Sequence, residues 1–131
     1  MKAAPVTCPF CSPLPTALFY ESRSVVCLWD SFPVSAGHAL IVPRRHVARW
    51  SEATPDERQE LTSAISEVQR IIEEQYHPAG FNVGFNDGRA AGQTVGHLHV
   101  HVIPRYVGDV PDPRGGIRLV IPDKARYWEN E

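Results

Sequence analysis

The sequence predicts an α+β protein, in which short strands form a mostly antiparallel sheet and one long helix packs against it. Three observations support this fold class. The chain has 131 residues, about the size of one domain with a single core. Strand-like segments lie on both sides of one long segment with helical periodicity. Strands and helices that are segregated in this way along a chain are typical of α+β folds.

Five segments are expected to form strands, because each is short, apolar and bounded by turn residues. They are 17–21, 24–30, 38–43, 81–85 and 97–103, the last ended by Pro104. We expect them to form a five-stranded meander with one long helix and a short second helix. Residues 1–131 read as a single domain, with a core over 8–105 and a Pro- and Gly-rich tail over 106–131. Within the tail, residues 117–121 look strand-like.

The long helix is expected to begin at Pro55. Thr54 can cap it, Pro55 suits the first helical position, and Glu57 completes a capping box. Pro78 and Gly80 end the helical pattern. Apolar residues recur between these ends with helical spacing and predict one buried stripe: Leu61, Ala64, Ile65, Val68, Ile72 and Tyr76.

The composition excludes several classes of partner. The formal net charge is -2, so the protein has no overall attraction for nucleic acid or for an anionic membrane surface. No apolar segment approaches the roughly 20 residues of a membrane span. Residues 1–9 lack the apolar core of a signal peptide. We therefore expect a cytoplasmic protein with no membrane partner and no nucleic-acid partner.

The three cysteines are expected to be reduced thiols in that compartment. Cys8 and Cys11 form a C-x2-C pair, which is half of a zinc site or a redox pair. A thioredoxin-like redox function would need a strand–helix–strand unit around the pair, and the sequence does not show one. Cys27 lies in an apolar segment and reads as a small core residue.

The sequence HLHVHV at 97–102 carries the strongest functional signal. Side chains on a strand alternate between its faces, so we expect His97, His99 and His101 on one face and the intervening apolar residues in the core. Three imidazoles on one face suit phosphate binding, proton transfer or metal binding. A solvated strand face is the alternative.

A Gly-rich segment runs directly into these histidines. It contains NDG at 86–88 and GQTVG at 92–96. Glycines let backbone N–H groups approach an anion closely, and Gln93 and Thr94 add neutral donors. Before a histidine strand, this segment predicts a phosphate-binding loop.

These motifs resemble the histidine triad (HIT) superfamily. The resemblance rests on GQTVGHLHVHVIPR at 92–105 and GHALIVPRRH at 37–46, and it spans roughly residues 8–105. The tail at 112–122, DPRGGIRLVIP, is similar to tails of bacterial members. The resemblance implies a HIT-like domain, a small-molecule nucleotide substrate and a homodimer.

The resemblance also implies a two-step mechanism. His99 attacks the α-phosphate of a nucleotide, a covalent nucleotidyl-histidine forms, and water then releases the nucleoside monophosphate. A neutral imidazole is a suitable nucleophile near pH 7. His101 and Gln93 would contact the phosphate oxygens and assist the leaving group, and His38 would support the triad. A structural role at a strand start is the alternative for His38.

Further positions match nucleotide-binding residues of the family. Asp30 matches the acidic residue that binds ribose hydroxyls, and its alternative is a turn-forming aspartate. Phe10 and Leu28 match residues that line the base pocket, and either could be plain core. Asn86 matches a polar residue near the α-phosphate, with a turn residue as its alternative, and Thr94 belongs to the phosphate-binding loop.

The family resemblance also extends the cysteine pair to a metal site. In some relatives a C-x2-C pair joins a histidine after the third strand and the first histidine of the triad. Carried over, this gives Cys8, Cys11, His46 and His97 as zinc ligands. Four protein ligands would make the zinc structural, and no other cofactor is implied. The alternative is a pair of plain thiols.

Three functions follow in order of preference. The first is hydrolysis of dinucleoside polyphosphates at the α-phosphate through His99. The second is hydrolysis of the P–N bond of adenosine 5′-phosphoramidates, which needs the same nucleophile but a different leaving group. The third is a regulatory module that binds nucleotides without turnover, which would have no need of the nucleophile.

Overall fold

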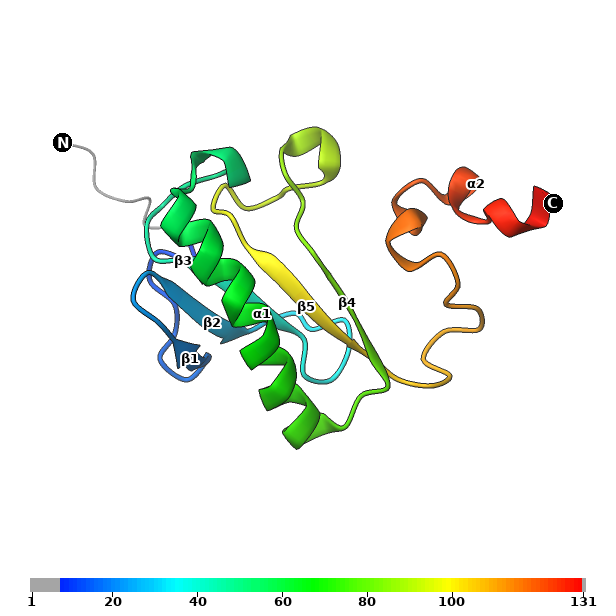
Figure 1. Ribbon diagram of the computed structural model, residues 1–131, viewed down its shortest axis with the longest axis horizontal. Coiled ribbons are helices and arrows are strands. Elements are labelled where there is room, and N and C mark those ends of the chain that lie inside the picture. The colour runs from blue at the N-terminus through cyan, green and yellow to red at the C-terminus, as the bar shows by residue number, and fades with distance from the viewer. Residues whose placement is uncertain (1–7, 131) are drawn as a thin grey trace.

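The computed structural model describes residues 8–130, which form a five-stranded sheet with one long helix across one face (Figure 1). The strand order is β1-β2-β3-β5-β4, and all neighbours are antiparallel. The predicted α+β fold class is confirmed, including the long helix α1 and the short helix α2. The elements are β1 (Leu18–Glu21), β2 (Val25–Trp29), β3 (Ala39–Pro43), η1 (Trp50–Glu52), α1 (Pro55–Tyr76), β4 (Gly80–Gly84), η2 (Arg89–Ala91), β5 (Val100–Arg105), η3 (Gly116–Val120), α2 (Pro122–Ala125) and η4 (Tyr127–Asn130).

The sheet differs from the expected meander in the position of one strand. The first three strands follow one another, but β4 lies at the edge of the described sheet and β5 lies between β3 and β4. The connection between β3 and β4 explains this order. Its helix, α1, has 22 residues, and a rise of about 1.5 Å per residue lets it cross the whole sheet. The chain re-enters the sheet as β4, two positions beyond β3, and β5 then takes the position between them.

The long helix begins and ends where the sequence predicts. The Thr54 side chain accepts a 3.1 Å hydrogen bond from the Glu57 N–H, and the Glu57 carboxylate accepts one of 2.8 Å from the Thr54 N–H. His77 ends the helix in a left-handed conformation with φ of 55°. The buried stripe contains Leu61, Ala64, Val68 and Ile72. No helix within residues 8–130 is both long and apolar enough to cross a membrane.

The two faces of the sheet have different coverings. On the face under α1, strand residues form the main core with the helix: Val25, Cys27, Ala39, Ile41, Val100 and Val102. On the opposite face, β2 and β3 contribute a smaller cluster: Val26, Leu28, Leu40 and Val42. Phe10 and Leu18 pack against this second cluster. The N-terminal segment that carries Phe10 therefore covers part of the face that α1 leaves open.

The histidine segment enters the sheet later than the sequence predicts. β5 begins at Val100, so His97 and His99 precede the strand and His101 lies within it. The pairing of β3 with β5 ends where Ile41 lies opposite Val100, so no strand partner holds the residues before Val100 in the pleated conformation. The apolar residues of the segment nevertheless lie in the main core as predicted: Leu98, Val100 and Val102.

At its other end β5 continues past the predicted stop at Pro104. The strand ends at Arg105, and Pro104 lies opposite Phe81 of the edge strand β4. Proline lacks only the N–H group, and its carbonyl oxygen here accepts a 2.7 Å hydrogen bond from the Ser35 hydroxyl. The strand therefore loses one donor at Pro104 but keeps its acceptor.

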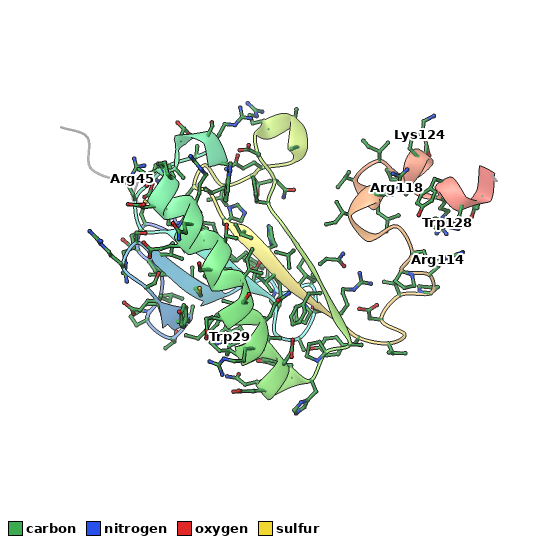
Figure 2. All side chains as sticks on the ribbon, viewed as in Figure 1. Trp29, Arg45, Arg114, Arg118, Lys124 and Trp128 are labelled. Carbon is green, nitrogen blue, oxygen red and sulfur yellow. The ribbon has the colours of Figure 1, made fainter. Side chains whose placement is uncertain are left out.

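The tail does not contain the strand predicted over residues 117–121. These residues lie in and just after the 3-10 helix η3. The Arg118 guanidinium donates hydrogen bonds of 2.7 and 3.1 Å to the carbonyl oxygens of Lys124 and Ala125, and this folds the segment back on itself. In Figures 1 and 2 the tail lies beyond the edge strand β4, and its residues Gly116 and Ile117 line a pocket together with Asn82 of β4. Within the tail, the Arg114 guanidinium lies over the ring of Trp128 at 4.6 Å.

Candidate active site and metal centre

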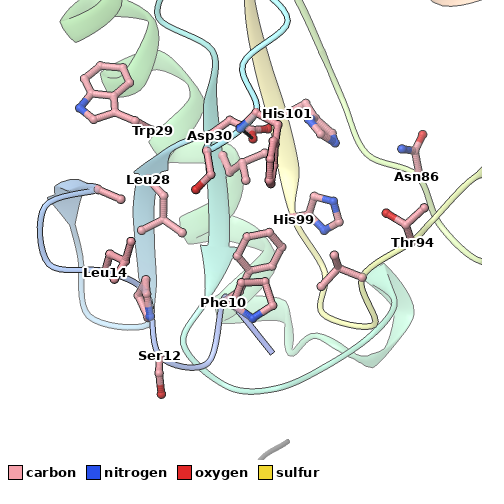
Figure 3. Close-up of a pocket in the computed structure, with 17 residues that line it drawn as sticks. Phe10, Ser12, Leu14, Leu28, Trp29, Asp30, Asn86, Thr94, His99 and His101 are labelled. Carbon is pink, nitrogen blue, oxygen red and sulfur yellow. Dashed lines mark hydrogen bonds between the residues drawn. The ribbon is translucent and has the colours of Figure 1, made fainter. Parts of the chain in front are cut away.

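A pocket lies on the face of the sheet opposite α1 (Figure 3). Its volume is about 460 Å³, within the range of roughly 300–1,000 Å³ that is usual for small-molecule sites. Apolar side chains, among them Phe10 and Leu28, lie to one side, and Asn86 and Thr94 lie across from them with His99 in between. The pocket thus combines an apolar compartment with polar groups near an imidazole.

His99 is held with one ring nitrogen free. Its Nδ1 lies 2.8 Å from the carbonyl oxygen of His97. A carbonyl oxygen can only accept, so Nδ1 carries the proton and Nε2 keeps its lone pair. The side chain is buried at 7% exposure, and the Phe10 ring packs on it with 5.0 Å between centroids. This arrangement fixes the orientation and the tautomer that a nucleophilic imidazole needs.

His38 and His101 form a hydrogen-bonded pair beside His99. The Val34 N–H donates to Nδ1 of His38 at 3.1 Å, so the proton of a neutral His38 ring must be on Nε2. This Nε2 lies 3.0 Å from Nδ1 of His101 and 3.3 Å from Oδ2 of Asp30. His38 therefore donates to His101, and the remaining proton of His101 is on its Nε2. These contacts hold Asp30, His38 and His101 together as a compact cluster.

Burial keeps both of these rings neutral. Desolvation lowers the pKa of His101 to about 4, with a smaller contribution from the neighbouring histidines. Desolvation also lowers the pKa of His38, although the nearby Asp30 carboxylate opposes the shift. His101 thus enters the pocket as a neutral hydrogen-bond donor near pH 7.

A second cluster joins the N-terminal segment to the histidine segment. Cys8, Cys11, His46 and His97 place one ligand atom each so that all four atoms lie within 4.8 Å of one another. The Nε2 of His97 lies 2.8 Å from the carbonyl oxygen of Pro43. This fixes the proton on Nε2 and leaves the lone pair of Nδ1 for the cluster.

The spacing of the four atoms fits a tetrahedral zinc ion. Zinc–sulfur bonds of about 2.3 Å and zinc–nitrogen bonds of about 2.0 Å place S and N ligands about 3.5 Å apart and two N ligands about 3.3 Å apart. Nδ1 of His97 lies 3.5 and 3.6 Å from Sγ of Cys8 and Cys11, and 3.2 Å from Nδ1 of His46. Nδ1 of His46 lies 3.0 Å from Sγ of Cys11. The donor set and its spacing therefore match a structural zinc site.

Comparison with known proteins identifies the family. The HIT domain matches residues 12–108, which is most of the chain and contains the pocket histidines. This chain belongs to the HIT family. The Bacillus subtilis protein named Protein hit is 35% identical over 103 residues, covering 76% of this chain and 71% of its own length.

Two enzymes are among the relatives of this HIT protein. The bis(5′-nucleosyl)-tetraphosphatase [asymmetrical] of Schizosaccharomyces pombe is 37% identical over 97 residues, which cover 74% of this chain and 53% of that protein. A bis(5′-adenosyl)-triphosphatase of Saccharomyces cerevisiae is 38% identical over 114 residues, which cover 86% of this chain and 52% of that protein. The chain spans about half the length of these two enzymes.

One solved structure that resembles this chain over almost its whole length is described as zinc-bound. A protein described as a Zn-bound histidine triad family protein from Mycobacterium smegmatis has a TM-score of 0.72 and 30% identity, covering 95% of this chain and 98% of its own. The likeness thus includes the tail as well as the core of the HIT domain.

The structure brings most of the residues expected to bind substrate into one pocket. The pocket that contains His99 and His101 is also lined by five of the six predicted substrate-binding residues: Asp30, Asn86, Thr94, Phe10 and Leu28. One carboxylate oxygen of Asp30 accepts a 2.8 Å hydrogen bond from the Phe32 N–H. His38, at 3% exposure, lies behind the lining and contacts it through His101.

Gln93 is placed differently from the other predicted residues. Its amide nitrogen donates to the carbonyl oxygens of Ala48 and Val95 at 2.7 and 3.0 Å, and its amide oxygen accepts from the Gly88 N–H at 2.9 Å. It lines a neighbouring groove rather than the pocket. In this structure Gln93 therefore holds the Gly-rich loop in shape.

Several lining residues were missed by the sequence analysis. The clearest is Phe32, an aromatic side chain at 87% exposure in the loop directly after Asp30. The usable signal in the sequence was an aromatic residue in a loop, two positions after a predicted ribose-binding carboxylate. Ser12, Leu14 and Trp29 also line the pocket, but their sequence context carries no functional pattern.

Proposed function

We propose that this HIT protein hydrolyses dinucleoside polyphosphates at the α-phosphate, with His99 as the nucleophile. One observation carries the proposal: Nε2 of His99 keeps its lone pair inside a pocket of nucleoside size, because Nδ1 donates to the His97 carbonyl oxygen. The relationship to a tetraphosphatase and a triphosphatase supports the choice of substrate.

In the first step Nε2 of His99 forms a bond to the α-phosphorus, and the bond from phosphorus to the bridging oxygen breaks. The leaving group departs as a nucleotide whose terminal phosphate is stable as an anion. In the second step water attacks the phosphorus, the P–N bond breaks, and its electrons return to Nε2. The nucleoside monophosphate leaves, and the proton of the water passes to solvent. His101 donates through Nε2 to a phosphate oxygen in both steps.

The leaving group favours the polyphosphate over the phosphoramidate. An amine must gain a proton as it departs, whereas a nucleotide phosphate need not. Burial lowers the pKa of His101 to about 4, so this ring stabilises charge near pH 7 but is not an imidazolium ready to give up a proton. Phosphoramidate hydrolysis remains the second candidate, because it would use the same nucleophile.

The proposed substrate contacts follow the lining of the pocket. Phe10 and Leu28 would contact the base, and the free lone pairs of Asp30 would accept from the ribose hydroxyls. Asn86 and Thr94 would donate to the α-phosphate from the opposite side. Gln93 would act by holding the phosphate loop, and through its own donors if the loop rearranges around substrate.

We propose a structural zinc ion held by Cys8, Cys11, His46 and His97. When bound, it would supply a tetrahedral cross-link between the N-terminal segment and the histidine segment. The thiol pair supports a cation here, because desolvation and the adjacent Cys8 raise the pKa of Cys11, and a cation would relieve the cost of two neighbouring thiolates. The homodimer that the family resemblance implies stays a prediction.

The test is a panel of substrates followed by chromatography of the products. Diadenosine tri- and tetraphosphate should release AMP together with ADP or ATP, and adenosine 5′-phosphoramidate should react more slowly. Faster turnover of the phosphoramidate would favour the second candidate. Binding of AMP without turnover of any member of the panel would contradict the hydrolase and favour the regulatory module.

A further inference from the structure

A second groove borders the pocket on the side of the Gly-rich loop. Its volume is about 780 Å³, and Thr94 lines both the groove and the pocket that contains His99. The groove lies between the segment that precedes η1 and the loop around η2, which contribute Arg49 and Arg89. It therefore continues the pocket in the direction away from the apolar side chains that would hold the base.

The charges of this groove are positive. None of the residues that line it is acidic, and two of them are arginines. Nε of Arg49 lies 3.3 Å from Oδ1 of Asp87, so that guanidinium is held and partly compensated. Arg89 is exposed, and among residues 8–130 it has neither a hydrogen-bond partner nor an ion-pair partner for its side chain. One uncompensated guanidinium thus stands beside the phosphate loop.

The groove is also built on a backbone of fixed shape. The Gln93 amide bonds to Gly88, Ala48 and Val95 tie the two ends of the loop together. A side-chain carbon placed on Gly92 would meet no atom within 4 Å, so the backbone borders open space there. The φ of +94° at Gly92 favours glycine. The open space at Gly92 leaves room for a chain of phosphates. The N–H groups of Gly92 and Gln93 donate within the loop, to the carbonyl oxygens of Arg89 and Gly88, so the charge that faces the phosphates comes from the Arg89 side chain.

We propose that this groove binds the distal phosphates of the leaving group and that Arg89 is their main ligand. The inference rests on the proposed function, in which the α-phosphate lies at His99 and the remaining phosphates must leave the pocket past Thr94. A guanidinium binds phosphate oxygens in a bidentate manner. Arg89 is then a specificity-determining residue that selects substrates with an anionic leaving group over substrates that release a neutral amine.

The experiment compares two substrates with the same nucleoside and α-phosphate. For Arg89→Ala, kcat/KM for diadenosine tetraphosphate should fall by about fivefold to tenfold at low salt, as suits an exposed charge contact. The value for adenosine 5′-phosphoramidate should not change. Arg89→Lys keeps the charge but not the bidentate fork. Its kcat/KM for diadenosine tetraphosphate should therefore lie between the values of Arg89→Ala and of the unmodified protein. The matched control is Arg70→Ala, which removes an exposed arginine of α1. This variant should leave kcat/KM unchanged for both substrates.

A binding measurement separates this inference from the proposed function. Calorimetry with inorganic tripolyphosphate should show weaker binding to Arg89→Ala than to the unmodified protein or to Arg70→Ala. Equal tripolyphosphate binding by the unmodified protein, Arg89→Ala and Arg70→Ala would overturn the inference and leave the proposed hydrolase intact. An equal loss of kcat/KM for both substrates in Arg89→Ala would do the same. Weaker tripolyphosphate binding by Arg89→Ala in a protein that turns over neither substrate would instead support the groove and refute the hydrolase.

Discussion

The backbone carbonyl oxygen of His97 accepts a 2.8 Å hydrogen bond from Nδ1 of His99, while the ring of His97 itself enters the cluster with the cysteines. The residue that orients the proposed nucleophile is therefore also a proposed metal ligand. Its ring is further fixed by the Pro43 carbonyl oxygen at 2.8 Å. A metal ion at the cluster would stabilise the backbone that sets the tautomer of His99, without touching the reacting atoms.

Replacement of a cysteine in the cluster should lower stability more than it lowers catalysis. We expect Cys8→Ser to lose most of its bound zinc and to melt on the order of 10 °C lower, because structural zinc binding is linked to folding. Turnover per folded molecule should fall far less. Elemental analysis, calorimetric melting and AMP release measured on the same preparations provide the three readouts.

The control for this prediction is Cys27→Ala. Cys27 is fully buried in the main core, so its truncation should also lower the melting temperature, by leaving a small cavity. The zinc content of Cys27→Ala should stay at that of the unmodified protein. If the unmodified protein holds no zinc even after it is supplied, the cysteine pair has another role.

Local signals in the sequence predicted most of the fold. The capping box at Thr54 predicted the start of α1, and the helix ends at the left-handed residue His77, directly before the predicted stop signals Pro78 and Gly80. The strand order could not be read in the same way, because it depends on how far α1 carries the chain across the sheet. The prediction of a strand over residues 117–121 was wrong. The strand-like composition of this segment is outweighed by the hydrogen bonds of Arg118 to two carbonyl oxygens.

The site was predictable where residue type determines the chemistry. His99 and His101 line one pocket with Asp30. The HLHVHV pattern predicted the two histidines from residue type, whereas Asp30 was expected only from the family resemblance. The position of Gln93 was not predictable, since its amide is used by Ala48, a residue 45 positions away. The backbone carbonyl that holds Nδ1 of His99 is a contact that the family resemblance implies but that side-chain patterns do not encode.

The pair of His38 and His101 predicts a loss of turnover without a matching loss of affinity. His38→Ala removes the donor to Nδ1 of His101, so the ring of His101 is free to take the tautomer that cannot donate to phosphate. We expect kcat to fall about tenfold or more with little change in KM, and stability to fall by about 1–3 kcal/mol because a buried acceptor loses its partner.

Rescue by glutamine distinguishes positioning from packing at His38. The amide of His38→Gln offers both an acceptor for the Val34 N–H and a donor for His101, so part of the lost kcat should return. If His38→Ala has a lower melting temperature but the kcat of the unmodified protein per folded molecule, the role of His38 is structural.

Asp30 predicts a difference between two ligands that differ only in their ribose. If its carboxylate accepts from the diol, Asp30→Ala should weaken AMP binding by about 1.5–3 kcal/mol. The binding of 2′,3′-dideoxy-AMP should change much less, because that ligand lacks both hydroxyls. Calorimetric titration of both ligands checks this, and equal losses would place the role of Asp30 at its contact with His38.

Glu60 predicts a pH-dependent part of the stability. Hydrogen bonds from the hydroxyls of Ser22 and Ser24 and from the Ser24 N–H hold the pKa of Glu60 at about 2. The folded pKa lies below the unfolded one, so the stabilisation is complete above the ordinary glutamate pKa and is lost as the pH falls towards 2. The difference in melting temperature between the unmodified protein and Glu60→Gln should therefore shrink from pH 5 to pH 2. A constant difference would contradict the assignment.

The proposed role of His99 as the nucleophile gives the most direct prediction. His99→Ala removes the atom that forms the covalent bond, so AMP release should fall by several orders of magnitude. AMP affinity should change little, because the proposed contacts of Asp30 with the ribose and of the Gly-rich loop with the phosphate remain. His101→Ala should cost less, about 10²–10⁴-fold, since His101 assists without bonding to phosphorus. His77→Ala, at the end of α1, is the histidine control.

Trapping the intermediate completes this test. The unmodified enzyme, quenched in base because a phosphoramidate is labile in acid, should gain the mass of one AMP group, and the label should map to the peptide that contains His99. His99→Ala should show no adduct, whereas His101→Ala should retain it and lose it more slowly. Turnover by His99→Ala at a rate near that of the unmodified enzyme would refute covalent catalysis, and it would require that water attack the α-phosphorus directly.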